Sequence, residues 1–121
     1  MNVILDSSFL ITIATKPIKR MYILEDLECI VLSAIIKELK SLEGSKSVKR
    51  AIAARTALEL IERMKVRIID IKGEPIDDLI IEYADKNSSY IATLDKEMKK
   101  KAKDRGIGVI TLSKDEVIIE R

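Results

Sequence analysis

The chain has 121 residues, of which 47% are hydrophobic and 35% are charged, and its formal net charge is +2. This length and composition predict one compact domain over residues 1–121 and exclude a disordered chain. The sequence contains no histidine, which excludes His-based acid–base catalysis, histidine-containing triads and His-ligated zinc, while the slight positive charge permits a nucleic-acid partner without requiring one.

The first half of the chain alternates between short apolar runs and helical patterns. Asn2–Leu5 has the aliphatic character of a buried strand, and Asp6, Ser7 and Ser8 offer capping side chains to a helix over Phe9–Ala14. The pattern then predicts a short helix over Lys19–Leu27, a strand over Cys29–Leu32, a helix capped by Ser33 and ended by Gly44, and a long helix over Ser47–Met64 with Val48 and Ile52 among its inward residues.

The second half continues the same alternation. The pattern predicts a strand over Val66–Ile71, a helix that begins near Asp77, a strand over Ser89–Leu94, a basic helix over Asp95–Lys103 and a strand over Gly108–Leu112. Val117–Ile119 is either an edge strand or a contact with a partner. Because parallel strands need crossover helices, this alternation predicts an α/β, doubly wound (Rossmann-like), mostly parallel sheet of about five strands with helices on both faces.

Four carboxylates fall where such a sheet would bring them together. Asp6 and Asp95 follow the first and fourth predicted strands, so both lie at the carboxyl edge of the sheet, where ligands bind in open α/β folds. Glu38 lies little more than one turn into its helix, and Asp77 opens another helix at the same edge. Like charges held together need a cation, and oxygen-only ligands favour Mg²⁺ or Mn²⁺ over zinc, so metal-activated water is the expected chemistry.

Each of these acids also has an ordinary structural explanation. Asp77 and Asp78 are suitable N-caps, Asp6 is a suitable turn residue, and Glu38 is a suitable solvated charge on a helix. The adjacent Asp77 and Asp78 leave open which of the two belongs to the site. The convergence of the acids at one edge of the sheet favours a functional site over four separate coincidences.

Five segments, spread over nearly the whole chain, resemble the PIN-domain nucleases: Val3–Ser8, Ser33–Leu39, Ile76–Ile80 with Ala84, Ile91–Asp95 and Gly108–Leu112. The resemblance implies a PIN-like fold, a Mg²⁺ or Mn²⁺ site, and hydrolysis of RNA phosphodiester bonds. It implies that Asp6, Glu38, Asp77 and Asp95 are the acidic set that binds the metal and carries catalysis, with Asp77 preferred to Asp78 because Ile80 and Ala84 then have the usual spacing. It also implies a small hydroxyl residue near the site at Ser7 and Thr93, and a further acid at Glu97.

The resemblance extends to two branches of the family. One contains ribosomal-RNA processing proteins and their small archaeal relatives, and the other contains the toxins of toxin–antitoxin pairs. The expected partners are therefore RNA, a second copy of the chain in a homodimer, and either an antitoxin or a ribosome-assembly factor. A catalytically silent PIN-like module that binds RNA or protein is the remaining alternative.

Basic residues crowd the predicted helix that follows Asp95: Lys96, Lys99, Lys100, Lys101, Lys103 and Arg105. Lysine charges supply most of the affinity for phosphates, so this helix is a candidate RNA guide, and a solvated face is the alternative. Cys29 is the only cysteine and lies in an apolar run, which predicts a buried, inert thiol and a reducing cytoplasm. No segment has the pattern of a signal peptide or a membrane span.

Overall fold

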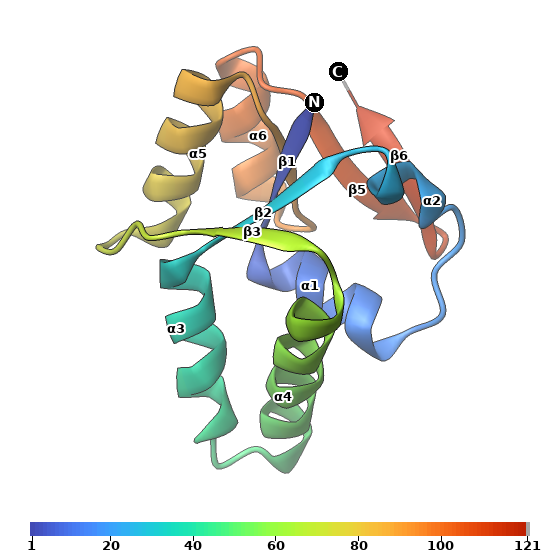
Figure 1. Cartoon of the computed structure of the whole chain (residues 1–121), viewed down its shortest axis with the longest axis vertical. Helices are drawn as coiled ribbons and strands as arrows, with labels where there is room; N and C mark the ends of the chain where they lie inside the picture. The colour runs from blue at the N-terminus through green and yellow to red at the C-terminus, as the bar shows by residue number, and fades with distance from the viewer. Residues whose placement is uncertain (121) are drawn as a thin grey trace.

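The computed structural model describes residues 1–120, which contain six helices and six strands (Figure 1). The helices are α1 (Ser7–Thr15), α2 (Tyr22–Glu25), α3 (Ser33–Glu43), α4 (Val48–Arg63), α5 (Ile76–Asn87) and α6 (Lys96–Asp104). The strands are β1 (Asn2–Leu5), β2 (Glu28–Leu32), β3 (Val66–Ile69), β4 (Tyr90–Ala92), β5 (Val109–Ser113) and β6 (Glu116–Glu120).

All these strands form one sheet in the order β3-β2-β1-β4-β5-β6. The pairings from β3 to β5 are parallel, and β6 pairs antiparallel to β5. The strand order reverses between β1 and β4, where Leu5 lies opposite Ala92. The prediction of a doubly wound, mostly parallel sheet is therefore confirmed. Val117–Ile119 belongs to the edge strand β6, so the sheet has six strands rather than about five.

Helices cover both faces of the sheet, and this explains the apolar character of its central strands. Helices α1, α3 and α4 pack together on one face, and α5 and α6 pack together on the other (Figure 1). β1, β2 and β4 are buried at nearly every position, as expected of parallel strands that are covered on both sides. No helix within residues 1–120 combines the length and the apolar character that crossing a membrane would need.

The sequence-based boundaries are wrong at two places where backbone or hydroxyl groups find partners elsewhere in the fold. The predicted helix over Lys19–Leu27 shrinks to α2, because Lys19 donates its N–H to the Asp115 carbonyl and accepts from the Val117 N–H, which ties it to the β5–β6 hairpin. Ser33 is the first residue of α3 rather than its cap. Its hydroxyl lies 3.0 Å from the Ile71 carbonyl oxygen, on the neighbouring strand connection.

The inward face predicted for α4 is also partly wrong. Val48 is 72% exposed and Ile52 is 56% exposed, whereas Ala54, Ala57 and Ile61 are buried. The amino-terminal end of α4 projects beyond the sheet beside α3 (Figure 1), so its apolar side chains have no core to enter there. Cys29 is buried as predicted, and burial raises the pKa of its thiol to about 11, which keeps it protonated and inert.

Candidate active site

Asp6 and Asp95 lie at the carboxyl edge of the sheet where the strand order reverses, as the sequence predicts. Asp6 directly follows β1, and its backbone N–H donates to the carbonyl of Ala92, the last residue of β4, at 2.9 Å. Asp95 lies three residues beyond Ala92 and caps α6. The parallel pairing of β1 with β4 thus brings together residues that are far apart in the sequence.

Asp6 is a buried carboxylate held in a fixed orientation. Its side chain is 6% exposed, and one oxygen accepts the backbone N–H of Ser7 at 2.9 Å, which caps α1. The other oxygen accepts hydroxyl hydrogen bonds from Thr93 at 2.7 Å and from Ser8 at 3.2 Å. Burial raises the pKa of Asp6 above its usual value although these hydrogen bonds lower it, and the nearby negative charge of Glu38 adds to the increase.

Two hydroxyl groups connect Asp6 to the segment that carries Asp95. The Thr93 hydroxyl oxygen accepts the backbone N–H of Asp95 at 3.1 Å, and the Ser8 hydroxyl oxygen accepts the backbone N–H of Leu94 at 3.1 Å. The prediction of a small hydroxyl near the site is therefore supported for Thr93. On the α1 side, the hydroxyl that bonds the Asp6 carboxylate belongs to Ser8 and not to Ser7, because the Ser7 contact uses its backbone N–H.

Asp95 also has a structural role, as the N-cap of α6. One of its carboxylate oxygens accepts the backbone N–H of Glu97 at 2.9 Å and of Met98 at 3.5 Å, so it caps the first turn of α6. Its side chain remains exposed to solvent. Glu97 is exposed as well, and it is its backbone N–H that bonds Asp95. The same turn thus fixes the Asp95 carboxylate at the carboxyl edge of the sheet.

Glu38 and Asp77 reach this region from opposite sides. They line an open hollow of about 640 Å³ together with Glu74, Pro75 and Ile76. Burial and the nearby charges of Asp6 and Asp95 raise the pKa of Asp77, and the positive charge of Lys101 partly offsets them. Asp6, Glu38, Asp77 and Asp95 are therefore near enough to influence one another electrostatically, and we call this set the acidic mouth.

Asp77 and Asp78 are adjacent in the sequence but lie in different surroundings. Asp77 is half-buried and lines the hollow beside Glu38, whereas Asp78 is exposed and does not line it. The hollow also contains Glu74, an exposed carboxylate that sequence analysis missed. Its position three residues before Asp77 was the available signal, but only the folded path of the β3–α5 connection directs it toward Glu38.

The donor chemistry of the acidic mouth fits a hard divalent cation bound with part of its water shell. Within the described residues, no group of three or more Asp, Glu or Cys side chains is arranged to hold a metal ion directly. Mg²⁺ typically retains several waters and binds through one or two carboxylates, which such an arrangement can provide. Burial is the main cause of the raised pKa of Asp6 and of Asp77, and a cation would relieve the repulsion between carboxylates that adds to it.

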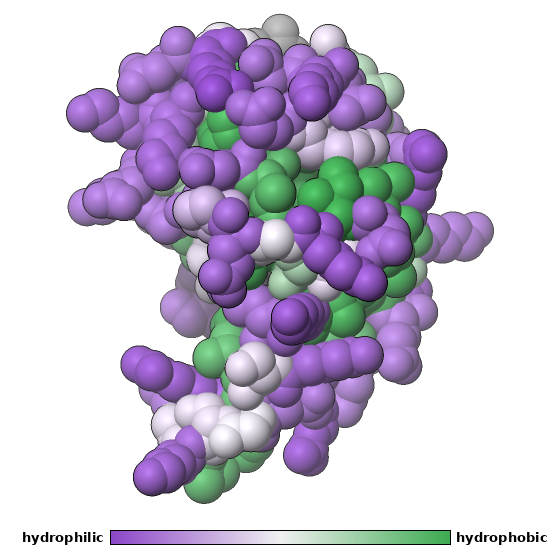
Figure 2. Space-filling view, turned by 90° about the vertical axis from the view of Figure 1, so that its left-hand side faces the viewer, coloured by the Kyte–Doolittle hydropathy of each residue, from purple (hydrophilic) through white to green (hydrophobic). Residues whose placement is uncertain are grey.

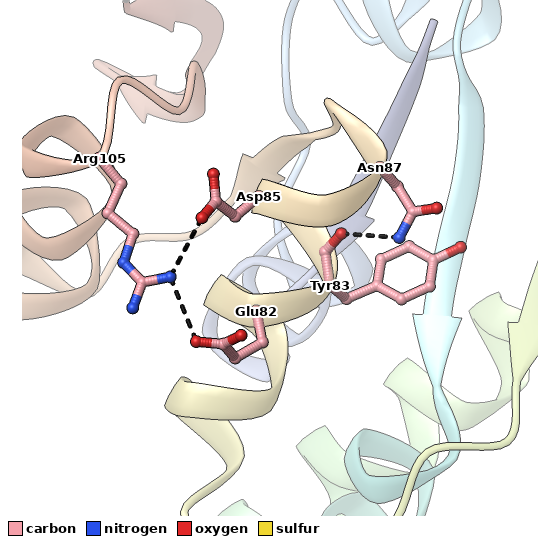
Figure 3. Close-up of polar contacts among 5 residues, drawn as sticks. All are labelled: Glu82, Tyr83, Asp85, Asn87 and Arg105. Atoms are coloured by element: carbon pink, nitrogen blue, oxygen red, sulfur yellow. Dashed lines mark hydrogen bonds and ion pairs between the residues drawn. The ribbon is translucent and has the colours of Figure 1, made fainter.

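The basic residues of α6, together with Arg105 directly after it, divide into those that form ion pairs and those that do not. Lys103 lies 2.8 Å from Glu120, and Figure 3 shows Arg105 between Glu82 and Asp85 of α5, at 3.2 Å and 3.3 Å. These ion pairs tie the end of α6 to its neighbours. No ion pair engages Lys96, Lys99, Lys100 or Lys101 within residues 1–120, so these remain the candidate RNA contacts on α6.

A separate cavity of about 500 Å³ lies at the far end of α5 and α6. Asp85, Tyr90, Arg105 and Gly108 are among its lining residues, and none of the acids of the mouth lines it. It lies beside the amino-terminal ends of β4 and β5, at the opposite edge of the sheet. We therefore do not assign it to the candidate active site.

Comparison with known sequences gives a consistent family. The sequence model of the PIN-like domain family matches residues 3–115. Ribonuclease VapC9 of Archaeoglobus fulgidus is 40% identical over 71% of this chain, and the match spans 62% of the length of that relative. Ribonuclease VapC4 of Methanocaldococcus jannaschii is 29% identical over 92% of this chain and 89% of its own length.

Comparison with solved structures supports the same fold. A domain of a functionally unknown protein from Methanocaldococcus jannaschii superposes with a TM-score of 0.62 at 20% identity, covering 99% of this chain and 96% of that chain. A PilT N-terminus domain protein from Sulfolobus solfataricus superposes with a TM-score of 0.52 at 15% identity, covering 92% and 87%. At these identities the likeness concerns the fold alone.

Proposed function

We propose that this chain, which belongs to the PIN-like domain family, is a ribonuclease whose acidic mouth uses Mg²⁺ or Mn²⁺ to hydrolyse RNA phosphodiester bonds. The observation that carries the proposal is the convergence of Asp6, Glu38, Asp77 and Asp95, from separate elements, at the switch point of the sheet. The names of the two relatives, both ribonucleases, support it. They favour a cleaving enzyme over a silent binding module.

The side chains divide the work in a way that follows from their surroundings. Asp6 is the fixed ligand, because three hydrogen bonds hold its carboxylate in place and burial prevents water from replacing its partners. Asp95 is held by its capping hydrogen bonds. Glu38 and Asp77 border an open hollow, so they can turn toward the cation or toward its waters. When bound, the cation supplies an activated water and neutralises charge on the phosphate.

Thr93 and Ser8 act as positioning residues in this proposal. Their hydroxyl groups donate to the Asp6 carboxylate while accepting backbone N–H groups from the turn before α6. This arrangement keeps Asp6 and Asp95 in a constant relation to each other. Lys101, whose charge acts on Asp77, is suited to attract a phosphate to the mouth.

The decisive experiment is RNA cleavage with and without Mn²⁺ or Mg²⁺. We expect metal-dependent cleavage by the wild type and losses of at least about 100-fold in Asp6→Asn and in Asp95→Asn. Both asparagine variants should fold, because asparagine is a good helix cap at positions 6 and 95. Asp77→Asn should be impaired, whereas the matched neighbour Asp78→Asn should cleave like the wild type. Full activity in both Asp6→Asn and Asp95→Asn would overturn the proposal.

The VapC names also favour the toxin branch over the ribosomal-RNA processing branch. We accordingly propose an antitoxin as the partner of this chain. Co-expression with the product of the adjacent gene tests this: an antitoxin should suppress both growth inhibition and RNA cleavage by the chain. Cleavage of precursor ribosomal RNA without growth inhibition would instead favour the processing role.

A further inference from the structure

A groove leads away from the acidic mouth along α3. The hollow beside Glu38 and Asp77 adjoins a second hollow of about 620 Å³, and both are lined by Glu38, Glu74 and Ile76. The second hollow lies between α3 and the β3–α5 connection, over residues 70–75. Figure 2 faces this side of the molecule and shows hydrophobic surface among hydrophilic side chains. The two hollows therefore form one channel that is open to solvent, which we call the α3 groove.

The lining of the α3 groove combines apolar surface with charges of both signs, and its two acids, Glu38 and Glu74, lie at the end shared with the hollow beside Asp77. Ala34, Leu42 and Ile76 contribute apolar surface. Lys37, on α3, and Lys72, on the β3–α5 connection, contribute a positive charge on each side. Away from the two acids, a ligand that carries regularly spaced negative charges and apolar faces matches the lysines and the apolar surface. A single RNA strand has this chemistry, because its phosphates alternate with ribose and with bases that are not hidden in a duplex.

Both lysines are available to a phosphate. Lys37 is exposed, and no ion pair engages it within the part of the chain that the structure describes. Lys72 lies 3.8 Å from Asp70, but both side chains are more than three-quarters exposed, at 77% and 78%, so their attraction is weak and easily exchanged. At the end of α6, by contrast, Lys103 and the following Arg105 already bond carboxylates at 2.8 Å to 3.3 Å.

We propose that the α3 groove binds the single-stranded RNA segment adjoining the cleaved bond, with Lys37 and Lys72 on its phosphates. This inference rests on the proposed ribonuclease function and adds the path of the substrate. The lining contains no aromatic side chain on which bases could stack, so binding should tolerate different base sequences. The acids at the mouth then act, through the cation, on the phosphate that is cleaved. The lysines in the groove bind the neighbouring phosphates directly.

The test measures binding separately from cleavage. A fluorescein-labelled 12-nucleotide RNA of mixed sequence is titrated with full-length protein in EDTA, by anisotropy, at several salt concentrations. The double variant Lys37→Ala with Lys72→Ala is compared with Lys40→Ala with Lys65→Ala, which removes the same charge from exposed lysines outside the groove. Repulsion by the metal-free mouth is common to all these proteins and cancels from the comparison.

Each lost contact with single-stranded RNA should lower the log–log salt slope by about 0.7, so the groove variant should lose about 1.4 and bind roughly 25-fold more weakly near 0.1 M salt. The control variant should resemble the wild type. No RNA binding by the wild type, wild-type binding by the groove variant, or equal weakening of both variants would overturn the inference. Metal-dependent RNA cleavage by the wild type tests the ribonuclease proposal separately. If the wild type cleaves RNA but the groove variant binds RNA like the wild type, only the proposed RNA path is wrong. If the groove variant binds RNA more weakly but the wild type does not cleave RNA, only the proposed ribonuclease activity is wrong.

Discussion

Replacing Asp6 with asparagine should stabilise the metal-free protein. Burial raises the pKa of Asp6 despite the hydrogen bonds from Thr93, Ser7 and Ser8, so the ionised carboxylate is less favourable in the fold than in the unfolded chain. Asp6→Asn removes that charge and retains a capping oxygen. At pH 7 and without metal, we expect the free energy of unfolding to rise, because the unfavourable buried charge outweighs the hydroxyl hydrogen bonds that the asparagine nitrogen cannot accept.

The pH dependence follows from the same shift. Because the folded pKa of Asp6 is raised above 3.8, its contribution to stability is fully present below that pH and is lost as the pH rises through the folded pKa. Asp77 contributes with the same sign. In the metal-free wild type these two groups should therefore lower the melting temperature as the pH rises through this window, and the Asp6→Asn variant should show a flatter profile.

A divalent cation should reverse the order of the melting temperatures of the wild type and the Asp6→Asn variant. For 121 residues the entropy of unfolding is about 0.25 kcal/mol per K, so 1 kcal/mol shifts the melting temperature by about 4 °C. Mn²⁺ at about one hundred times its Kd would stabilise the wild type by about 2.7 kcal/mol, or about 11 °C, and Asp6→Asn far less. Metal-free Asp6→Asn should thus melt above the wild type, and with Mn²⁺ it should melt below it.

Circular dichroism melts in EDTA and in Mn²⁺ test this crossover, with Asp78→Asn as the matched control. Asp78 is exposed and does not line the hollow, so its variant should follow the wild type in both conditions. An equal gain from Mn²⁺ in Asp6→Asn and in the wild type would contradict the role of Asp6 as a metal ligand. A metal-free Asp6→Asn variant that melts below the wild type, while Asp78→Asn does not, would contradict the unfavourable buried charge.

Three further predictions concern other parts of the molecule. The double variant Lys99→Glu with Lys100→Glu should bind RNA more weakly, and the log–log salt slope of its binding should fall by about 1.4. Anisotropy curves that superimpose on those of the wild type at every salt concentration would show that this face of α6 is only solvated. Gly108→Ala would bring a Cβ atom within 2.6 Å of the Tyr90 ring. The free energy of unfolding should therefore fall by about 1–3 kcal/mol and the melting temperature by roughly 4–12 °C. An unchanged melting temperature would show that the ring can move aside. We also expect a homodimer, since Ile119 on the edge strand β6 remains 45% exposed, and light scattering at micromolar concentration would contradict this by giving a monomer mass.

Much of the candidate site could be predicted from local sequence because it depends on strand ends. An aspartate that directly follows a buried parallel strand must lie at the carboxyl edge, and the alternation of strands and helices makes the strands parallel. Asp6 and Asp95 could therefore be assigned to one edge without coordinates, and the structure has both there, as the caps of α1 and α6. Thr93, which the family resemblance implied, lies 2.7 Å from Asp6. The hydroxyl of Ser8, which sequence analysis did not single out, bonds Asp6, because this depends on which hydroxyl the first turn of α1 directs at the carboxylate.

The sequence by itself determined the element order, the parallel sheet and the candidate acids, since these follow from hydrophobic periodicity and from residues adjacent to strands. Only the tertiary structure decided that Glu74 joins the hollow beside Glu38, that Val48 lies in solvent, and that Arg105 bonds two acids of α5. Each of these depends on how far a helix or loop extends past the sheet and which distant charge it meets. Such distances arise from packing between elements far apart in the chain, and no local pattern encodes them.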